Sequence, residues 1–167
     1  MFMKVGSAMT NPKLQHELKK RRPFDSAYEE ALLSLVRTSD RMEIQFARLF
    51  REHGITPSQY NVLRILRGEG KPLPILEIAS RTVCVVPGIT GLIDRLEEAG
   101  LVNRLRCEKD RRVIYVALKD KGMETLAGLD EPLAELHQKL VGHLAQAEVK
   151  ELIRLLEKLR GPWSDVH

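Results

Sequence analysis

Hydrophobic residues in the first third of the chain recur at the spacing of one helix face. After Pro23 they return every three or four positions as far as Phe50, which predicts one long amphipathic helix. His53 and Gly54 indicate where this helix ends. The stretch after the N-terminal tail is therefore expected to present a single apolar stripe.

The last third of the chain returns to helical spacing, with leucine as its main apolar residue. Leucines follow this spacing over 126–140 and again over 144–159, with a break expected near Gly142. Pro132 lies inside the first run and predicts a kink or a boundary there. Together with the N-terminal stripe, these seams hold more apolar surface than a thin central lobe can cover. We therefore expect a second copy of the chain to cover them.

Three shorter helices are predicted between the long ones. Thr56 has the character of an N-cap, because a proline follows it and a glutamine stands three positions later, so a helix should begin at Pro57. A third helix is expected over 75–82. After a β-branched link, Pro87 predicts the start of a fourth helix, which Gly100 ends. The order helix, tight turn, helix is typical of a helix-turn-helix motif.

The apolar spacing then changes to period two on either side of a polar stretch. Residues 101–107 and 112–118 read as strands, and residues 108–111 as the turn between them. No other segment has this pattern, so the expected sheet is a two-stranded hairpin.

These elements predict a mainly helical α+β fold with a winged helix-turn-helix lobe. We assign residues 1–23 to a basic, flexible tail and residues 55–118 to the winged lobe. Residues 24–54 and 119–161 would form a dimerisation layer.

Composition narrows the class of protein without deciding it. The 167 residues are 43% hydrophobic and 30% charged, which suits one domain of ordinary size. We see no apolar run long enough to span a membrane and no secretory signal, so we expect a cytoplasmic protein without a membrane partner. Cys84 and Cys107 are too few for a disulfide framework or a paired-cysteine zinc site, and we expect no metal and no cofactor.

The net charge of +4 is unevenly distributed along the chain. Residues 1–22 hold +5 of it, so the remainder sums to −1 and global basicity does not indicate nucleic-acid binding. Local patches must decide the question.

The fourth helix has an outward face that fits a DNA groove. Gly88 and Gly91 would allow close backbone approach, Thr90 can donate to phosphate, and Arg95 can reach phosphate or guanine. A solvated helix face is the alternative, because three acidic residues nearby would repel phosphate unless they are held away from it. These are Asp94, Glu97 and Glu98.

The predicted hairpin concentrates positive charge at its turn. Five basic residues (Arg104, Arg106, Lys109, Arg111 and Arg112) outnumber Glu108 and Asp110, which gives a charge of +3. A tip of this size fits a minor groove, where an arginine can insert. Asp110 can orient Arg112 by a bidentate pair, although an exposed ion pair of little consequence is the alternative.

These residues resemble those of MarR-type winged-helix regulators. The similarity is strong over 75–122 and looser over 28–159. Its specific marks are the segment TPSQYNVLRIL, the helix end DRLEEAGLV, and the wing pair Asp110-x-Arg112 followed by Gly122.

The resemblance implies an obligate homodimer that binds a palindromic operator in double-stranded DNA, usually as a repressor. It also implies recognition by the helix at 87–99 and insertion of Arg112 into the minor groove. Similar proteins respond to small aromatic or phenolic acids bound between the dimerisation layer and the winged lobe.

By this analogy, four residues could hold an acid effector, although each can equally be a surface or packing residue: Arg51, His53, Tyr60 and Arg64. A minor alternative is a redox response through Cys84, which lies in the turn before the recognition helix.

Other functional classes find less support in the sequence. We find no GxSxG, HExxH or P-loop pattern, so we do not expect an enzyme. A winged helix can also serve as a protein-interaction module, and sequence preference on DNA would separate the two.

Overall fold

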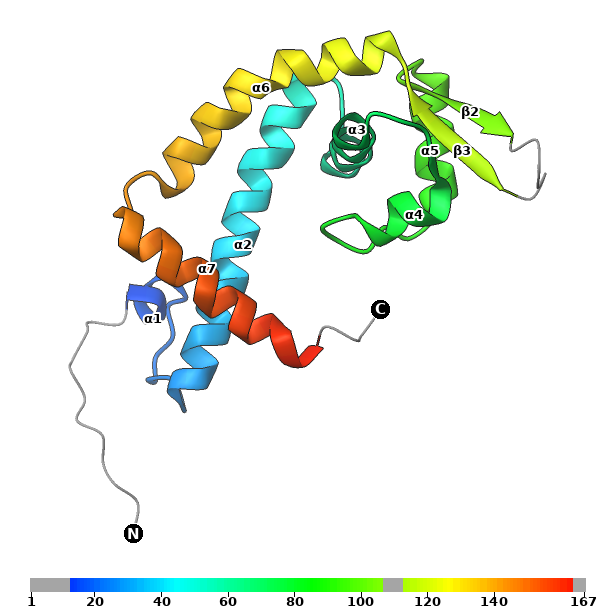
Figure 1. Cartoon of the computed structure of the whole chain (residues 1–167). Coiled ribbons are helices and arrows are strands. Elements are labelled where there is room, and N and C mark those ends of the chain that lie inside the picture. The colour runs from blue at the N-terminus through cyan, green and yellow to red at the C-terminus, as the bar shows by residue number, and fades with distance from the viewer. Residues whose placement is uncertain (1–12, 107–112, 164–167) are drawn as a thin grey trace. The chain divides into compact units, whose positions relative to one another are not determined.

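The computed structural model describes residues 13–106 and 113–163, as seven α-helices, one short 3-10 helix and three strands (Figure 1). These residues fall into two compact units that divide between Glu43 and Ile44. The expected mainly helical fold with a small winged sheet is confirmed. The helices are α1 (Lys13–Glu17), α2 (Ala27–Glu52), α3 (Pro57–Glu69), α4 (Ile75–Ser80), α5 (Ile89–Glu98), α6 (Asp120–Val141), α7 (Gln146–Arg160) and η1 (Gly161–Trp163), and the strands are β1 (Leu73–Pro74), β2 (Val102–Arg106) and β3 (Ile114–Leu118).

Local sequence signals set several helix ends as expected. The Thr56 hydroxyl accepts a hydrogen bond from the Gln59 backbone N–H at 3.2 Å, and the Gln59 side chain accepts one from the Thr56 N–H at 2.9 Å. Helix α6 ends just before Gly142, also as expected, but it continues through Pro132 without a boundary.

The sheet has three strands rather than the two expected, in the order β1-β3-β2, all antiparallel. The hairpin of β2 and β3 is confirmed, with Arg104 opposite Val116. The added strand β1 pairs Leu73 with Val116 from the other side. Two residues are too few to show period two, so the sequence pattern could not reveal a strand that exists only through pairing.

The hydrophobic core of the second unit lies where α3, α5, the sheet and α6 meet. Fully buried side chains come from each of these elements and from α4, namely Val62, Leu63, Leu66, Ile78, Ile93, Leu96, Val102, Val116, Leu126 and Leu129. Burying one such side chain contributes roughly 1.5–3 kcal/mol, so this cluster holds the helix-turn-helix and the sheet together.

Close backbone packing joins the start of α6 to the sheet. A Cβ placed on Gly122 would lie under 3.0 Å from the Leu101 carbonyl oxygen and the Leu118 side chain. Beside it, the Lys121 ammonium donates to the Ala99 carbonyl oxygen at 2.8 Å, at the end of α5. Further along α6, Asp130 forms a bidentate pair with Arg67 of α3, at 2.8 and 3.0 Å.

The long terminal helices keep apolar side chains in contact with solvent. On α2, Leu32 and Val36 are 52% and 64% exposed, and on α7, Ile153 and Leu155 are 51% and 48% exposed. No helix in the described part of the chain is long and apolar enough to cross a membrane.

We predict that Gly122→Ala lowers the free energy of unfolding by about 1–3 kcal/mol, because the new methyl group meets a backbone carbonyl that cannot move aside freely. The matched control is Gly128→Ala in the same helix, where a Cβ meets nothing within 4 Å and better helix propensity should raise stability by up to about 1 kcal/mol. Urea unfolding measures both. Equal effects of the two substitutions would contradict the proposed close packing at Gly122.

Candidate nucleic-acid interface

The recognition helix begins two residues later than expected. Its first residue is Ile89, and Gly88 is the N-cap with a φ of +70°. The predicted start at Pro87 is therefore wrong, because the chain turns through the left-handed region at Gly88 before the helix can begin. Gly88 is accordingly the N-cap in this turn and not a residue of the helix face, while its contact with DNA remains a prediction.

Three other predicted site residues do lie together on α5. Thr90 and Arg95 are exposed, while Leu92, Ile93 and Leu96 form the buried side. A Cβ on Gly91 would meet nothing within 4 Å, so packing inside the subunit does not require this glycine. No side chain caps the helix at Gly88, which leaves the positive end of α5 open to an anion.

Arg104 on β2 binds the acidic residues of α5. Its guanidinium lies 2.6 Å from the Asp94 carboxylate and 2.8 Å from the Glu97 carboxylate, and it donates to the Thr90 carbonyl oxygen at 3.2 Å. The Arg104 backbone N–H also donates to Glu97, at 2.8 Å. One side chain therefore fixes the wing strand to three points of the recognition helix.

This contact changes the electrostatics expected from the sequence. The backbone N–H of Arg104, and next its guanidinium, hold the pKa of Glu97 below its ordinary value, so Glu97 is ionised and paired. The Arg104 side chain is only 20% exposed. It neutralises α5 instead of adding to the wing's exposed charge, and the expected repulsion of phosphate by Asp94 and Glu97 is reduced.

The tip of the wing falls outside the described residues. The stretch 107–112 contains Lys109, Asp110, Arg111 and Arg112, so the DNA contacts expected of these residues remain predictions. Arg106, the last residue of β2, is exposed.

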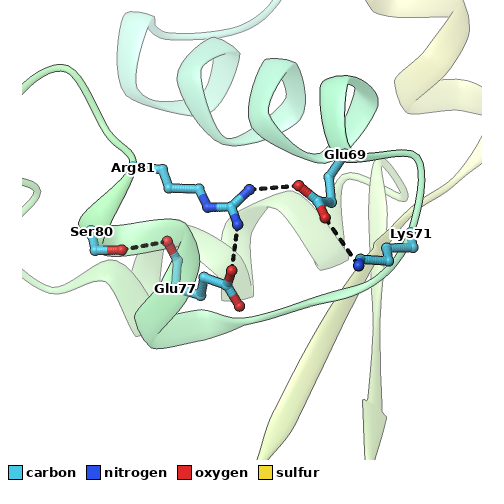
Figure 2. A network of polar contacts seen from close by, with 5 residues as sticks. All are labelled: Glu69, Lys71, Glu77, Ser80 and Arg81. Atoms are coloured by element: carbon cyan, nitrogen blue, oxygen red, sulfur yellow. Dashed lines mark hydrogen bonds and ion pairs between the residues drawn. The ribbon is translucent and has the colours of Figure 1, made fainter.

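A polar network fixes α4 beside the end of α3 (Figure 2). Arg81, directly after α4, binds Glu69 of α3 at 2.6 Å and also pairs with Glu77 of α4. Lys71 lies 3.2 Å from the other oxygen of Glu69. Arg81 first, and then Lys71, lower the pKa of Glu69. The network orients the first helix of the helix-turn-helix motif. Its bond between Arg81 and Glu69 could not be predicted from the sequence, because the two residues lie in different elements.

The four residues predicted to hold an acid effector mostly serve local contacts. The Tyr60 ring stacks on Phe50 with centroids 4.4 Å apart, and burial raises the pKa of its hydroxyl. His53 Nδ1 lies 3.1 Å from the Leu49 carbonyl oxygen. Arg64 donates to Asn61 at 3.1 Å, and Arg51 is exposed. Packing accounts for Tyr60 and His53, whereas the two arginines present charge to solvent.

Sequence reasoning missed a pocket of about 170 Å³ at the end of α3. Apolar side chains and two cations surround it, and the full lining is Leu66, Arg67, Gly70, Lys71, Pro72, Ala117, Leu118 and Met123. Cavities of roughly this size hold a single benzene ring. Residues from α3, β3 and α6 form it, so no local pattern could have revealed it.

The redox alternative through Cys84 remains a prediction. Cys84 is an exposed free thiol, and Cys107 lies outside the described residues. Within 13–106 and 113–163, no cluster of three or more His, Cys, Asp or Glu side chains could hold a metal ion.

A helix-turn-helix packed beside a three-stranded sheet, with one open helix face, is the architecture of winged-helix DNA-binding regulators. A sequence model of the MarR family matches residues 55–114. The transcriptional repressor MdtR of Bacillus subtilis is 30% identical over 139 residues, covering 81% of this chain and 86% of MdtR. This chain belongs to the MarR family.

Solved structures agree with this assignment. A MarR transcription factor from Planctomyces limnophilus is 45% identical, with a TM-score of 0.63, and the match covers 81% of this chain and 98% of that one. BpsR of Bordetella bronchiseptica is 24% identical with a TM-score of 0.73 over 87% of this chain and 100% of its own, which shows the shared fold. Since the relatives are transcriptional regulators, the expectation that this chain is not an enzyme is confirmed.

We predict that Arg104→Met weakens DNA binding by roughly tenfold, because two carboxylates of α5 become unpaired beside phosphate. Adding Asp94→Asn and Glu97→Gln should restore most of the affinity. Arg154→Met is the control, since it removes an exposed arginine paired with Glu151 on α7 and should leave DNA affinity unchanged. Fluorescence anisotropy with a labelled duplex measures all three. Failure of the two neutral substitutions to rescue binding would show that Arg104 acts through packing instead of charge.

Proposed function

We propose that this protein is a homodimeric repressor that reads a palindromic operator and releases it when a small acid binds. The observation that supports this best is the outward face of α5 and the pairing of its acidic residues. Its outward face holds Thr90, Gly91 and Arg95, and Arg104 pairs with two of the three nearby acidic residues, Asp94 and Glu97. A helix with this face fits a major groove.

Each residue of the proposed interface has a distinct role. Thr90 donates to phosphate, Arg95 reaches phosphate or the O6/N7 edge of guanine, and Gly91 lets the backbone come close. The wing would place Arg112 in the adjacent minor groove, oriented by Asp110. Lys109 and Arg111 would add phosphate contacts at the same tip.

Dimerisation is supported by the apolar faces of the long helices. Leu32, Val36, Ile153 and Leu155 are each about half exposed or more, although a soluble subunit gains free energy by burying such side chains. A second copy could cover each of these faces, and in a two-fold interface both subunits contribute the same residues. Two recognition helices related in this way would read two half-sites, which is why a palindrome is expected.

We predict that selection from a randomised duplex library at about 150 mM salt recovers a two-fold symmetric site, because weak phosphate-only binding is suppressed there. Arg112→Ala should relax the selected sequence and reduce the salt dependence of binding by roughly one counterion. Arg160→Ala, at the end of α7, serves as the control for removing one positive charge elsewhere. Recovery of no symmetric site would favour a protein-interaction module over this proposal.

An acid effector is the second part of the proposal. Regulation of DNA binding by 6-hydroxynicotinic acid is described for BpsR, which shares this fold. In this chain two places offer cations for a carboxylate: the exposed pair Arg51 and Arg64, and the pocket beside Arg67 and Lys71. Arg67 is held by the bidentate pair with Asp130, whereas Lys71 is largely exposed and makes a single contact with Glu69, so Lys71 can turn to a carboxylate more readily.

We predict that at least one acid in a panel of monocyclic aromatic and phenolic acids, 6-hydroxynicotinic acid included, lowers operator affinity by about 5- to 150-fold. Loss of this response in Arg64→Ala would indicate that the effector binds in the predicted crevice, beside Arg64 and Arg51. Loss in Lys71→Ala would place it in the pocket. Isothermal titration with each variant measures binding directly, and an unchanged operator affinity across the whole panel would contradict effector control.

A further inference from the structure

The loop between α4 and α5 exposes apolar side chains at an unusual place. Val83 and Val85 are 77% and 79% exposed, whereas the neighbouring Val86 and Ile89 pack against the core. The C-terminal end of the loop is thus anchored to the core, while Val83 and Val85 are largely exposed to solvent. Burying these two side chains against a partner surface would be favourable, because it removes apolar area from water.

The two hydroxyl side chains that precede these valines, Ser80 and Thr82, already donate to carbonyl oxygens of α4. The Ser80 hydroxyl donates to the Glu77 carbonyl oxygen at 2.9 Å, and the Thr82 hydroxyl donates to the Ala79 carbonyl oxygen at 2.8 Å. Hydroxyl groups that could have bound phosphate therefore turn back to their own helix. What the loop presents outward at 83 and 85 is methyl groups.

The position of the loop identifies the partner. It leads through the left-handed turn at Gly88 directly into α5, and the first residues of a recognition helix approach base edges in the major groove. The two valines therefore precede Thr90 and Gly91, which form the proposed DNA-reading face, by only a few residues along the chain. In the major groove the apolar group on a base edge is the C5-methyl of thymine.

We propose that Val83 and Val85 contact thymine methyl groups at the edge of each half-site, so that this loop adds a preference for thymine to the bases read by α5. The inference rests on the proposed function, because it requires α5 to enter the major groove. It assigns base selection to residues that make no hydrogen bond to DNA.

Replacing thymine by deoxyuridine in the selected operator tests this directly, because the exchange removes one methyl group and keeps base pairing. Each half-site should contain one or two thymines whose exchange weakens wild-type binding by about fourfold, the effect of burying a single methyl-sized group. The Val83→Ala/Val85→Ala variant should bind the thymine and deoxyuridine duplexes equally. Leu76→Ala is the matched control, since Leu76 is 81% exposed but lies on α4 and its loss should leave the thymine preference intact.

Binding is measured at a salt concentration low enough for every variant to bind, and thermal unfolding checks that the exposed substitutions leave the fold unchanged. Wild-type indifference to deoxyuridine at every position would overturn the inference, as would an equal preference for thymine in the double variant. If the double variant binds both duplexes more weakly by the same factor, its preference for thymine is unchanged. The valines then act through loop packing, and the inference fails. A wild-type protein that selects no operator at all would instead refute the proposed function.

Discussion

The contact between Arg104 and α5 is the interaction on which the proposed DNA-reading surface depends. A winged helix needs its recognition helix and its wing at a fixed separation, yet the two belong to different elements. Here one half-buried guanidinium binds Thr90, Asp94 and Glu97 from the neighbouring strand. The same contact sets the geometry and removes negative charge from a surface that would face phosphate, so position and electrostatics have one cause.

Two glycines show how backbone constraints support this arrangement. Gly88 adopts a left-handed conformation that lets the loop turn into α5, and Gly122 lets α6 pass close to the Leu101 carbonyl group. The first determines where the recognition helix begins, and the second determines how closely the sheet approaches the helix that follows it. Gly91 differs from both, because among the described residues no atom lies within 4 Å of a Cβ placed there. In the proposed function this glycine lets the backbone come close to DNA.

The structure describes a subunit with two kinds of incompletely buried surface. The apolar faces of α2 and α7 are broad and helical, which suits a second copy of the chain. The valines beside α5 are few and lie in a loop, which suits a narrow contact with base edges. The two apolar surfaces differ in shape, so they suit different partners. Amino-acid composition alone would reveal neither surface.

The sequence by itself determined the features that depend on near neighbours. Helix periodicity, the cap at Thr56, the break near Gly142 and the hairpin of β2 and β3 all follow from residues a few positions apart, and all are found in the structure. Tertiary structure alone decided the pairing of β1 with β3, the pocket beside Lys71 and the partners of Arg104. These features depend on which distant segments pack together. The charge or hydropathy of a side chain indicates what kind of group it can bind, but only the fold determines which group lies beside it.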